Sequence, residues 1–161
     1  MNITIEYIND HLESIKTVAK WHIDQWHNIL PDFTLDTYAE YLSSHYQRGG
    51  IPTLFAAVDK GKVIGTAALD DDDMDTHPQL SPWIASLYVD GKYRKKGVGS
   101  ALINRVIEEA RSAKVKKLYL FTPDREYYLA RFGWRTLFKE NYYGEMESVM
   151  VLDISPQTPS T

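Results

Sequence analysis

Residues 87–102, Leu-Tyr-Val-Asp-Gly-Lys-Tyr-Arg-Lys-Lys-Gly-Val-Gly-Ser-Ala-Leu, join the end of an apolar segment to the start of an amphipathic helix. Gly97 and Gly99 allow the backbone to adopt positive φ and to approach a ligand closely. The first turn of the following helix has unpaired N–H groups at the positive end of the helix dipole, and the adjoining lysines and Ser100 add charge and a hydroxyl donor. The stretch therefore predicts a site for an anion such as a pyrophosphate.

The spacing of these glycines excludes two common nucleotide-binding motifs. A P-loop needs Gly-Lys-Ser/Thr at a spacing that the segment lacks, and the dinucleotide fingerprint needs a third glycine where Leu102 stands. Ordinary turn chemistry before a helix remains an alternative. Nucleic acid is not an expected partner, because the basic residues concentrate at one loop and one helix end while the chain has a formal net charge of −4.

The segments around this stretch predict a strand–helix–strand crossover. Residues 83–89 are typical of a central strand, residues 97–113 of a helix with one apolar face, and residues 118–121 of a buried strand. A crossover of this kind makes its two strands parallel. The other elements expected are a strand at 3–7, a helix from 15 to Pro31, a helix capped by Asp32 or Thr34 and ending at Gly49-Gly50, a hairpin of 54–58 and 63–69, a short helix at 127–132, and strands at 134–138 and 147–152.

The length of 161 residues is typical of a single domain, and we expect one over residues 1–154 with a loose tail at 155–161. No apolar run is long enough to cross a membrane, and the N-terminus does not have the pattern of a signal peptide. We therefore expect a cytoplasmic protein with no membrane partner. The absence of cysteine excludes disulfides, thiolate metal ligands and a cysteine nucleophile.

Residues 87–102 resemble the signature of the GNAT superfamily of N-acetyltransferases. Arg94-x-x-Gly97-x-Gly99 matches the family's Arg/Gln-x-x-Gly-x-Gly/Ala motif, and the resemblance extends from Ile3 to Leu152. It implies an α+β fold: a mixed, mostly antiparallel sheet of 6 to 7 strands, splayed beside the strand that ends at Val89 and flanked by about four helices.

The resemblance also implies acetyl-CoA as the acyl donor. Backbone groups of Leu87, Tyr88 and Val89 would pair with the pantetheine arm, and an N–H of the same strand would polarise the thioester carbonyl. The remaining cofactor-binding residues implied by the motif are Arg94, Lys95, Lys96, Gly97, Val98, Gly99 and Ser100.

Acetyl transfer to an amine needs a base for the ammonium and benefits from an acid for the departing thiolate. Family members often use a tyrosine four residues before the glycine that ends the short helix, and here that position is Leu129. Tyr128 is the first candidate acid and Tyr127 the second. The alternative for both tyrosines is packing in the core or the cleft wall.

Five carboxylates crowd residues 70–75 and suggest a landing site for a cationic amine. From this segment we select Asp72, Asp73 and Asp75 as acceptor-binding candidates, with Trp83 in the next strand. The alternatives are a solvated, flexible loop for the aspartates and packing for Trp83. The candidate bases are the residues of this segment together with His77, Glu145 and Glu147.

No metal site is expected, because His22 and His27 are five residues apart and do not share a helix face. The function that we expect is acetyl transfer from acetyl-CoA to a primary amine of a small molecule or peptide, by direct attack. A catalytically inactive coenzyme A-binding sensor is the first alternative, and a scaffold whose basic segment meets an acidic partner is the second. The oligomeric state is open between a monomer and a homodimer.

Overall fold

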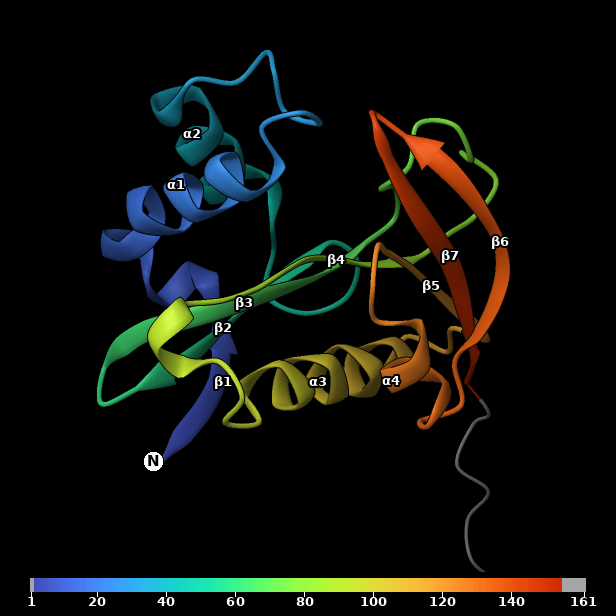
Figure 1. Cartoon of the computed structure of the whole chain (residues 1–161). Helices are drawn as coiled ribbons and strands as arrows, with labels where there is room; N and C mark the ends of the chain where they lie inside the picture. Colours follow the sequence, from blue (N-terminus) through green and yellow to red (C-terminus); the bar gives the residue numbers. More distant parts are fainter. Residues whose placement is uncertain (1, 155–161) are drawn as a thin grey trace, which may run out of the picture.

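The computed structural model describes residues 2–154, which form a single seven-stranded sheet with helices on both faces (Figure 1). The expected tail at 155–161 lies outside the described residues. The strand order is β1-β2-β3-β4-β5-β7-β6, and every neighbouring pair is antiparallel except β4 and β5. The strands are β1 (Ile3–Tyr7), β2 (Thr53–Asp59), β3 (Lys62–Asp70), β4 (Trp83–Val89), β5 (Lys117–Thr122), β6 (Arg135–Tyr142) and β7 (Glu145–Asp153).

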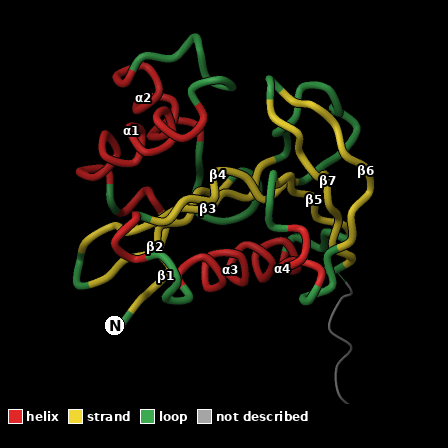
Figure 2. Tube along the Cα trace, in the orientation of Figure 1, coloured by secondary structure: helices red, strands yellow, loops and turns green. Residues whose placement is uncertain are grey.

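Within residues 2–154, four helices cover the sheet in two pairs. Helices α1 (Ile15–Trp26) and α2 (Leu35–His45) lie on one face, and α3 (Val98–Ser112) and α4 (Glu126–Ala130) lie on the other (Figure 2). Short 3-10 turns lie at Ile8–Asp10, Leu12–Ser14 and Gly91–Tyr93. The α+β fold, the mixed sheet and the parallel crossover through α3 are confirmed. Within the described residues, no helix combines the length and apolarity required to cross a membrane.

Helix α2 begins where the sequence predicts and ends earlier. Thr34 is the cap: its hydroxyl oxygen accepts from Thr37 N at 3.1 Å, and Thr34 N donates to Thr37 Oγ1 at 2.9 Å. The predicted end at Gly49-Gly50 is wrong, because Tyr46 already has extended backbone (φ −93°, ψ 142°). Its side chain turns into the protein and its hydroxyl donates to Asp70, so a tertiary contact ends the helix.

The sheet splays between β4 and β5. The two strands pair only at Trp83 and Tyr119, and the rest of β4 diverges from β5. On its other edge β4 has a bulge: Ala68 pairs with Ala85 and Thr66 with Tyr88, so two β4 residues lie opposite one residue of β3. The bulged residue Ser86 has φ 52°. The bulge bends β4, and the splay implied by the family resemblance is confirmed.

Separate apolar cores lie on the two faces. Under α3 the core contains Val98, Leu102 and Val106, and under α1 and α2 it contains Val18, Ala19 and Leu42. Gly65 permits the close approach of α3 to the sheet, because a Cβ there would lie 2.8 Å from Tyr88 O and 3.3 Å from Leu102 Cδ1. The position of α3 over β3 and β4 therefore depends on a missing side chain.

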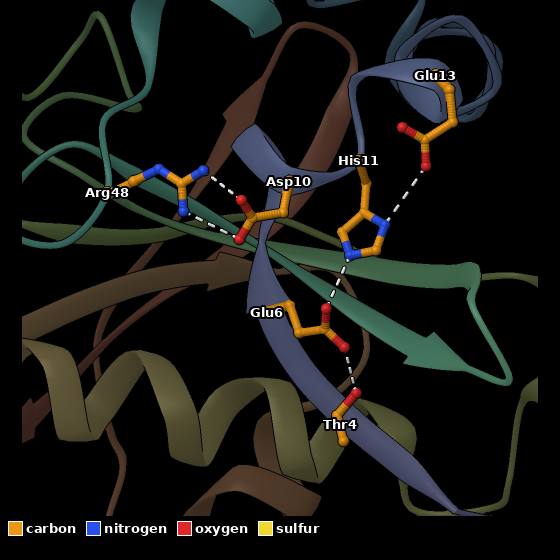
Figure 3. A network of polar contacts seen from close by, with 6 residues as sticks. All are labelled: Thr4, Glu6, Asp10, His11, Glu13 and Arg48. Carbon is orange, nitrogen blue, oxygen red and sulfur yellow. Dashed lines mark hydrogen bonds and ion pairs between the residues drawn. The ribbon is translucent and has the colours of Figure 1, made fainter.

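A polar network fixes the two turns that precede α1 (Figure 3). His11 lies between Glu6 on β1, at 2.9 Å, and Glu13, at 3.5 Å. The Asp10 carboxylate accepts hydrogen bonds from both terminal nitrogens of Arg48, which follows α2. The bond from Nη1 to Oδ2 is 3.0 Å long. The hydrogen bonds from Thr4 and then His11 lower the pKa of Glu6. The network joins β1 to both ends of the α1–α2 layer, although exposed ion pairs contribute little stability individually.

Candidate active site

The loop before α3 has the geometry of an anion-binding site. Lys95 has φ 62° and Gly97 has φ 84°, so the chain turns twice through left-handed conformations before the helix begins. Ala101 N donates to Gly97 O at 3.1 Å, which is the first bond of the helix. The N–H groups of Val98, Gly99 and Ser100 precede that bond and have no helical acceptor. Together with the exposed Lys95 and Lys96, they face an anion with partial and full positive charge.

The surface of this loop is open at Gly97. A Cβ built there meets nothing within 4 Å, and one at Gly99 meets only Val89 Cγ2, at 3.9 Å. Buried Val98 anchors the helix start in the core beneath. The loop can therefore hold the pyrophosphate of a coenzyme A thioester directly on its backbone, so the residues fit this cofactor.

Arg94 is turned back toward β4. Its Nε donates to Val89 O at 2.9 Å, and its guanidinium carbon lies 5.4 Å from the centre of the Tyr88 ring. Tyr88 stacks in turn on Trp21 of α1, with ring centres 5.3 Å apart. In this arrangement Arg94 secures the loop to the strand end.

The peptide groups of β4 alternate between β3 and the splayed side. Asp90 N donates to Ile64 O at 2.9 Å, so the peptide groups of Tyr88, two residues earlier, also face β3. Those of Leu87 and Val89 face the side from which β5 has diverged. Of the three strand residues predicted to pair with pantetheine, Leu87 and Val89 have their hydrogen-bonding groups directed there, although the Val89 carbonyl also accepts from Arg94, whereas Tyr88 is committed to β3.

A groove of about 750 Å³ runs between α3, α4 and β7. Ser100, Asn104 and Tyr128 line one part of it. The Tyr128 hydroxyl lies 2.5 Å from Ser100 Oγ, so the first candidate acid contacts a predicted cofactor residue. Tyr127 is 87% exposed, whereas Leu129, at the family's tyrosine position, is buried.

The acidic residues lie toward the opposite face of the sheet. Side chains alternate along each strand, and Asp70 shares the face of Ala68, which packs under α1 and α2. Glu147 shares the face of Val149, which packs with Trp83. Trp83 belongs to the same face as Ala85, also under α1 and α2. Asp70 and Glu147 therefore share one face of the splayed sheet, and the anion-binding loop lies at the other.

Three of these carboxyls have raised pKa values. Burial raises the pKa of Asp70 to about 7, against the lowering effect of the Tyr46 hydrogen bond at 2.9 Å. Burial, with Glu145 and Asp124 nearby, raises the pKa of Glu147 to about 7. Burial and the charges of Asp70, Asp72 and Glu147 raise the pKa of Asp73 well above its usual range. Asp70 and Glu147 are therefore poised to exchange a proton near neutral pH.

Two of these buried carboxyls have an oxygen without a hydrogen bond. Glu147 is 4% exposed and its Oε2 has no hydrogen-bond partner among the described residues. The same holds for Oδ1 of Asp70, which lies 3.9 Å from His45 Nε2. Buried acceptors are normally paired, so a donor such as an ammonium group would satisfy a real deficit here.

The acidic loop after β3 is anchored to the β6–β7 hairpin. Asp75 accepts from the Tyr143 hydroxyl, and its N–H donates to Tyr142 OH at 3.3 Å. His77 Nε2 lies 2.8 Å from Glu140 Oε1. These contacts oppose the interpretation of a free, flexible loop. Asp72, the remaining candidate, is exposed.

Trp83 packs in the core. It is completely buried against Met74, Tyr142 and Val149, and its indole N–H donates to Leu80 O at 2.7 Å. An indole in this position has no surface for an acceptor. Packing, the alternative for this residue, is what the structure supports.

His22, for which the sequence predicts no functional role, lies completely buried against Tyr38 and Thr66. Its position on the apolar face of α1 is the one feature of the sequence that could have indicated a buried histidine. Among the described residues, no three His, Cys, Asp or Glu side chains are grouped to hold a metal ion.

Comparisons with solved structures show the same fold in proteins of different names. An aminoglycoside 6'-acetyltransferase type Ii is 18% identical, with a TM-score of 0.70 over 98% of this chain and 100% of that one. The ribosomal-protein-S18-alanine N-acetyltransferase from Escherichia coli is 22% identical, with a TM-score of 0.66 over 99% of each chain. The N-acetylglutamate synthase from Neisseria gonorrhoeae, solved with coenzyme A and N-acetyl-glutamate, is 16% identical, with a TM-score of 0.66 over 96% of this chain and 36% of that one.

These names refer to an aminoglycoside, an alanine of a ribosomal protein and N-acetyl-glutamate, so the shared fold does not specify an acceptor. The comparison with curated proteins finds no match. The sequence model of the acetyltransferase (GNAT) family matches residues 15–134, which include the two helices of one face, the splayed strand, the anion-binding loop and α4. The chain therefore belongs to the GNAT acetyltransferase family and is an acetyltransferase that uses acetyl-CoA as its donor.

Proposed function

We propose that this acetyltransferase transfers the acetyl group of acetyl-CoA to a primary amine of a small molecule or peptide by direct attack on the thioester. One observation carries the proposal: buried, proton-exchanging carboxyls lie on one face of the splayed sheet, and an anion-binding loop lies at the other. A cationic amine and an anionic donor would thus approach from opposite faces.

Glu147 is the proposed base. A protonated alkylamine has a pKa of about 10.4, so it must lose a proton before it can attack. The Glu147 carboxylate is buried, has an oxygen without a hydrogen bond among the described residues, and has a pKa of about 7, which suits a base at neutral pH. Asp70, with a pKa of about 7, adds negative charge that attracts the ammonium form once it ionises. Asp73, with a pKa well above its usual range, favours its neutral form and would accept a hydrogen bond from the amine only through its carbonyl oxygen. The exposed Asp72 and the anchored Asp75 would act at longer range.

The other roles belong to β4 and α4. Acetyl-CoA supplies the thioester when it is bound. The Leu87 N–H, which faces the splayed side of β4, would donate to the carbonyl oxygen as negative charge develops there. Tyr128 would donate its phenolic proton to the leaving sulfur and is preferred to Tyr127, because its hydroxyl touches the cofactor loop.

Thiol release from acetyl-CoA, measured across polyamines, aminoglycosides, amino acids and peptide N-termini, tests the reaction. We expect the highest kcat/KM for amines that carry a second positive charge, because the acceptor side is acidic. Equal, low rates across the panel would contradict the proposal. Comparison of Tyr128→Phe with Tyr127→Phe tests the acid: kcat is expected to fall about 10- to 100-fold for Tyr128→Phe and much less for Tyr127→Phe. An unchanged rate and pH profile for Tyr128→Phe would reject the assignment.

A coenzyme A-binding sensor without catalysis is the second candidate function. The observation that favours it is Leu129, a buried apolar residue at the position where family members often have a tyrosine. The thiol-release panel separates the two functions, because a sensor would bind acetyl-CoA, as measured by calorimetry, while no amine of the panel increases thiol release.

A further inference from the structure

A chain of buried hydrogen bonds connects α1 to the bulge of β4. His22 Nδ1 lies 3.1 Å from Tyr38 OH, and His22 Nε2 lies 2.9 Å from Thr66 Oγ1. Thr66 Oγ1 also lies 2.9 Å from Ser86 O. His22 and Thr66 are both completely buried, so water does not substitute for these partners.

The number of protons in this set determines the state of the imidazole. The carbonyl of Ser86 can only accept, so the Thr66 hydroxyl must donate its single proton to it. Thr66 then accepts from His22, which places the imidazole proton on Nε2. Nδ1 is left to accept the proton of the Tyr38 hydroxyl. Burial lowers the pKa of His22 to about 3, which agrees with an imidazole that stays neutral because it has to donate and accept at once.

The end of this set lies at the strained residue of β4. Ser86 has φ 52°, a left-handed conformation that is strained for a residue with a side chain. The bulge also interrupts the ladder between β3 and β4. Where the ladder is interrupted, the hydrogen bond from Thr66 gives the Ser86 carbonyl an alternative donor, and so holds that carbonyl toward β3.

Because the peptide bond is planar, the fixed direction of the Ser86 carbonyl also fixes the direction of the Leu87 N–H. In a trans peptide, the C=O of Ser86 and the N–H of Leu87 lie in one plane and point in opposite directions. A carbonyl held toward β3 therefore directs the Leu87 N–H away from β3, toward the side from which β5 has diverged.

We infer that Thr66, oriented by His22, is a positioning residue for acetyl transfer: it holds the Ser86 carbonyl and so aims the Leu87 N–H at the oxygen of the thioester carbonyl. The inference rests on the role proposed above for Leu87. It adds two buried residues, from α1 and β3, that never touch the donor.

Infrared spectroscopy of bound acetyl-CoA, labelled with ¹³C at the thioester carbonyl, tests the inference without an acceptor. A hydrogen bond from Leu87 lowers the stretching frequency of the carbonyl below that of free acetyl-CoA. We expect this shift in the wild-type protein and in Thr66→Ser, which keeps the hydroxyl. It should be lost in Thr66→Val, which has the same shape without the hydroxyl.

The affinity for coenzyme A separates positioning from general damage. Coenzyme A has no acyl carbonyl, so its Kd should change less than about two-fold in Thr66→Val, whereas kcat with the best amine should fall about 10- to 100-fold, part of the loss seen when an oxyanion donor is removed. Should Thr66→Val not fold, His22→Leu and His22→Gln form a second pair. The glutamine can still donate to Thr66 and should keep the carbonyl shift that the leucine loses.

The inference is overturned if the wild-type carbonyl is not shifted, if Thr66→Val and His22→Leu keep the shift, or if coenzyme A affinity falls in parallel with kcat. A wild-type protein that shifts the carbonyl but acetylates no amine would contradict the proposed function and leave the positioning role intact.

Discussion

Single residues in this protein have properties that depend on burial more than on chemical type. Glu147 and Asp70 are ordinary carboxylates in sequence, and each has a pKa near 7 because the fold removes water from it. Glu145, two residues away on the same strand and exposed, is the natural comparison for Glu147.

Replacing Glu147 with glutamine should remove the base. We expect kcat/KM of the wild type to rise with pH through about 7 as Glu147 ionises. The variant should lack this limb and lose about 100-fold in rate or more. Glu145→Gln should keep the limb and move it to lower pH, because the charge of Glu145 raises the pKa of Glu147. A pH–rate profile that is the same for wild type and Glu147→Gln would exclude Glu147.

Replacing Asp70 with asparagine should stabilise the protein at high pH. Asp70 binds a proton more tightly in the folded state, with a pKa of about 7 against about 3.9 when unfolded, so its ionisation makes folding progressively less favourable as pH rises from 4 to 7. The penalty is on the order of 4 kcal/mol above pH 7 and is absent below pH 4. Asparagine avoids it and still accepts from Tyr46.

Urea unfolding of Asp70→Asn at pH 5 and pH 8 measures this effect. The gain in the free energy of unfolding should be larger at pH 8. Asp71→Asn, at an exposed position, should change stability by less than about 0.5 kcal/mol at either pH. A gain that is equal at both pH values, or a loss at pH 8, would show that the Asp70 carboxylate is not penalised by burial.

At the scale of elements, the loop before α3 depends on backbone that only glycine adopts without strain. Gly97 has φ 84° and an open surface, and Gly144, in the β6–β7 turn, has φ 92° and equally open surroundings. The two positions share a left-handed backbone conformation, which would strain any residue with a side chain, and they differ in what they face.

Gly97→Ala should weaken coenzyme A binding at least about ten-fold, because the methyl group occupies the anion surface and the strain of about 1 kcal/mol disturbs the loop. Gly144→Ala should lower the free energy of unfolding about as much as Gly97→Ala does. Its coenzyme A Kd, measured by calorimetry, should stay that of the wild type. Equal affinities of the two variants would place the pyrophosphate away from this loop.

At the scale of the whole molecule, the acceptor side is assembled from segments far apart in the chain. At the start of the acidic loop, Asp70 accepts a hydrogen bond from Tyr46, the residue that follows α2. Further along the loop, Asp75 and His77 contact the β6–β7 hairpin. Figure 1 shows this loop beside the tip of the hairpin, apart from the α3 loop.

Glu140→Gln should loosen this assembly without affecting the donor side. The loss of charge weakens the contact with His77, so we expect faster hydrogen exchange at residues 71–80 and a several-fold higher KM for the amine. Glu108→Gln, at a charged position on α3, is the control and should leave both unchanged. Faster exchange with an unaltered KM would indicate that the anchored loop does not shape the acceptor side.

The sequence alone determined the crossover, the seven strands, the anion-binding loop and the family, because each depends on local periodicity or on residues adjacent in the chain. Only the tertiary structure decided that Trp83 packs, that Tyr128 meets Ser100, that Glu147 and Asp70 share a face, and that His22 reaches Ser86 through Thr66. Apart from the contacts of Trp83 with Met74 and Leu80, these relations join residues 20 to 77 positions apart. They arise from burial and strand pairing, which fix pKa values and hydrogen-bond directions and leave no mark on the local pattern of the sequence.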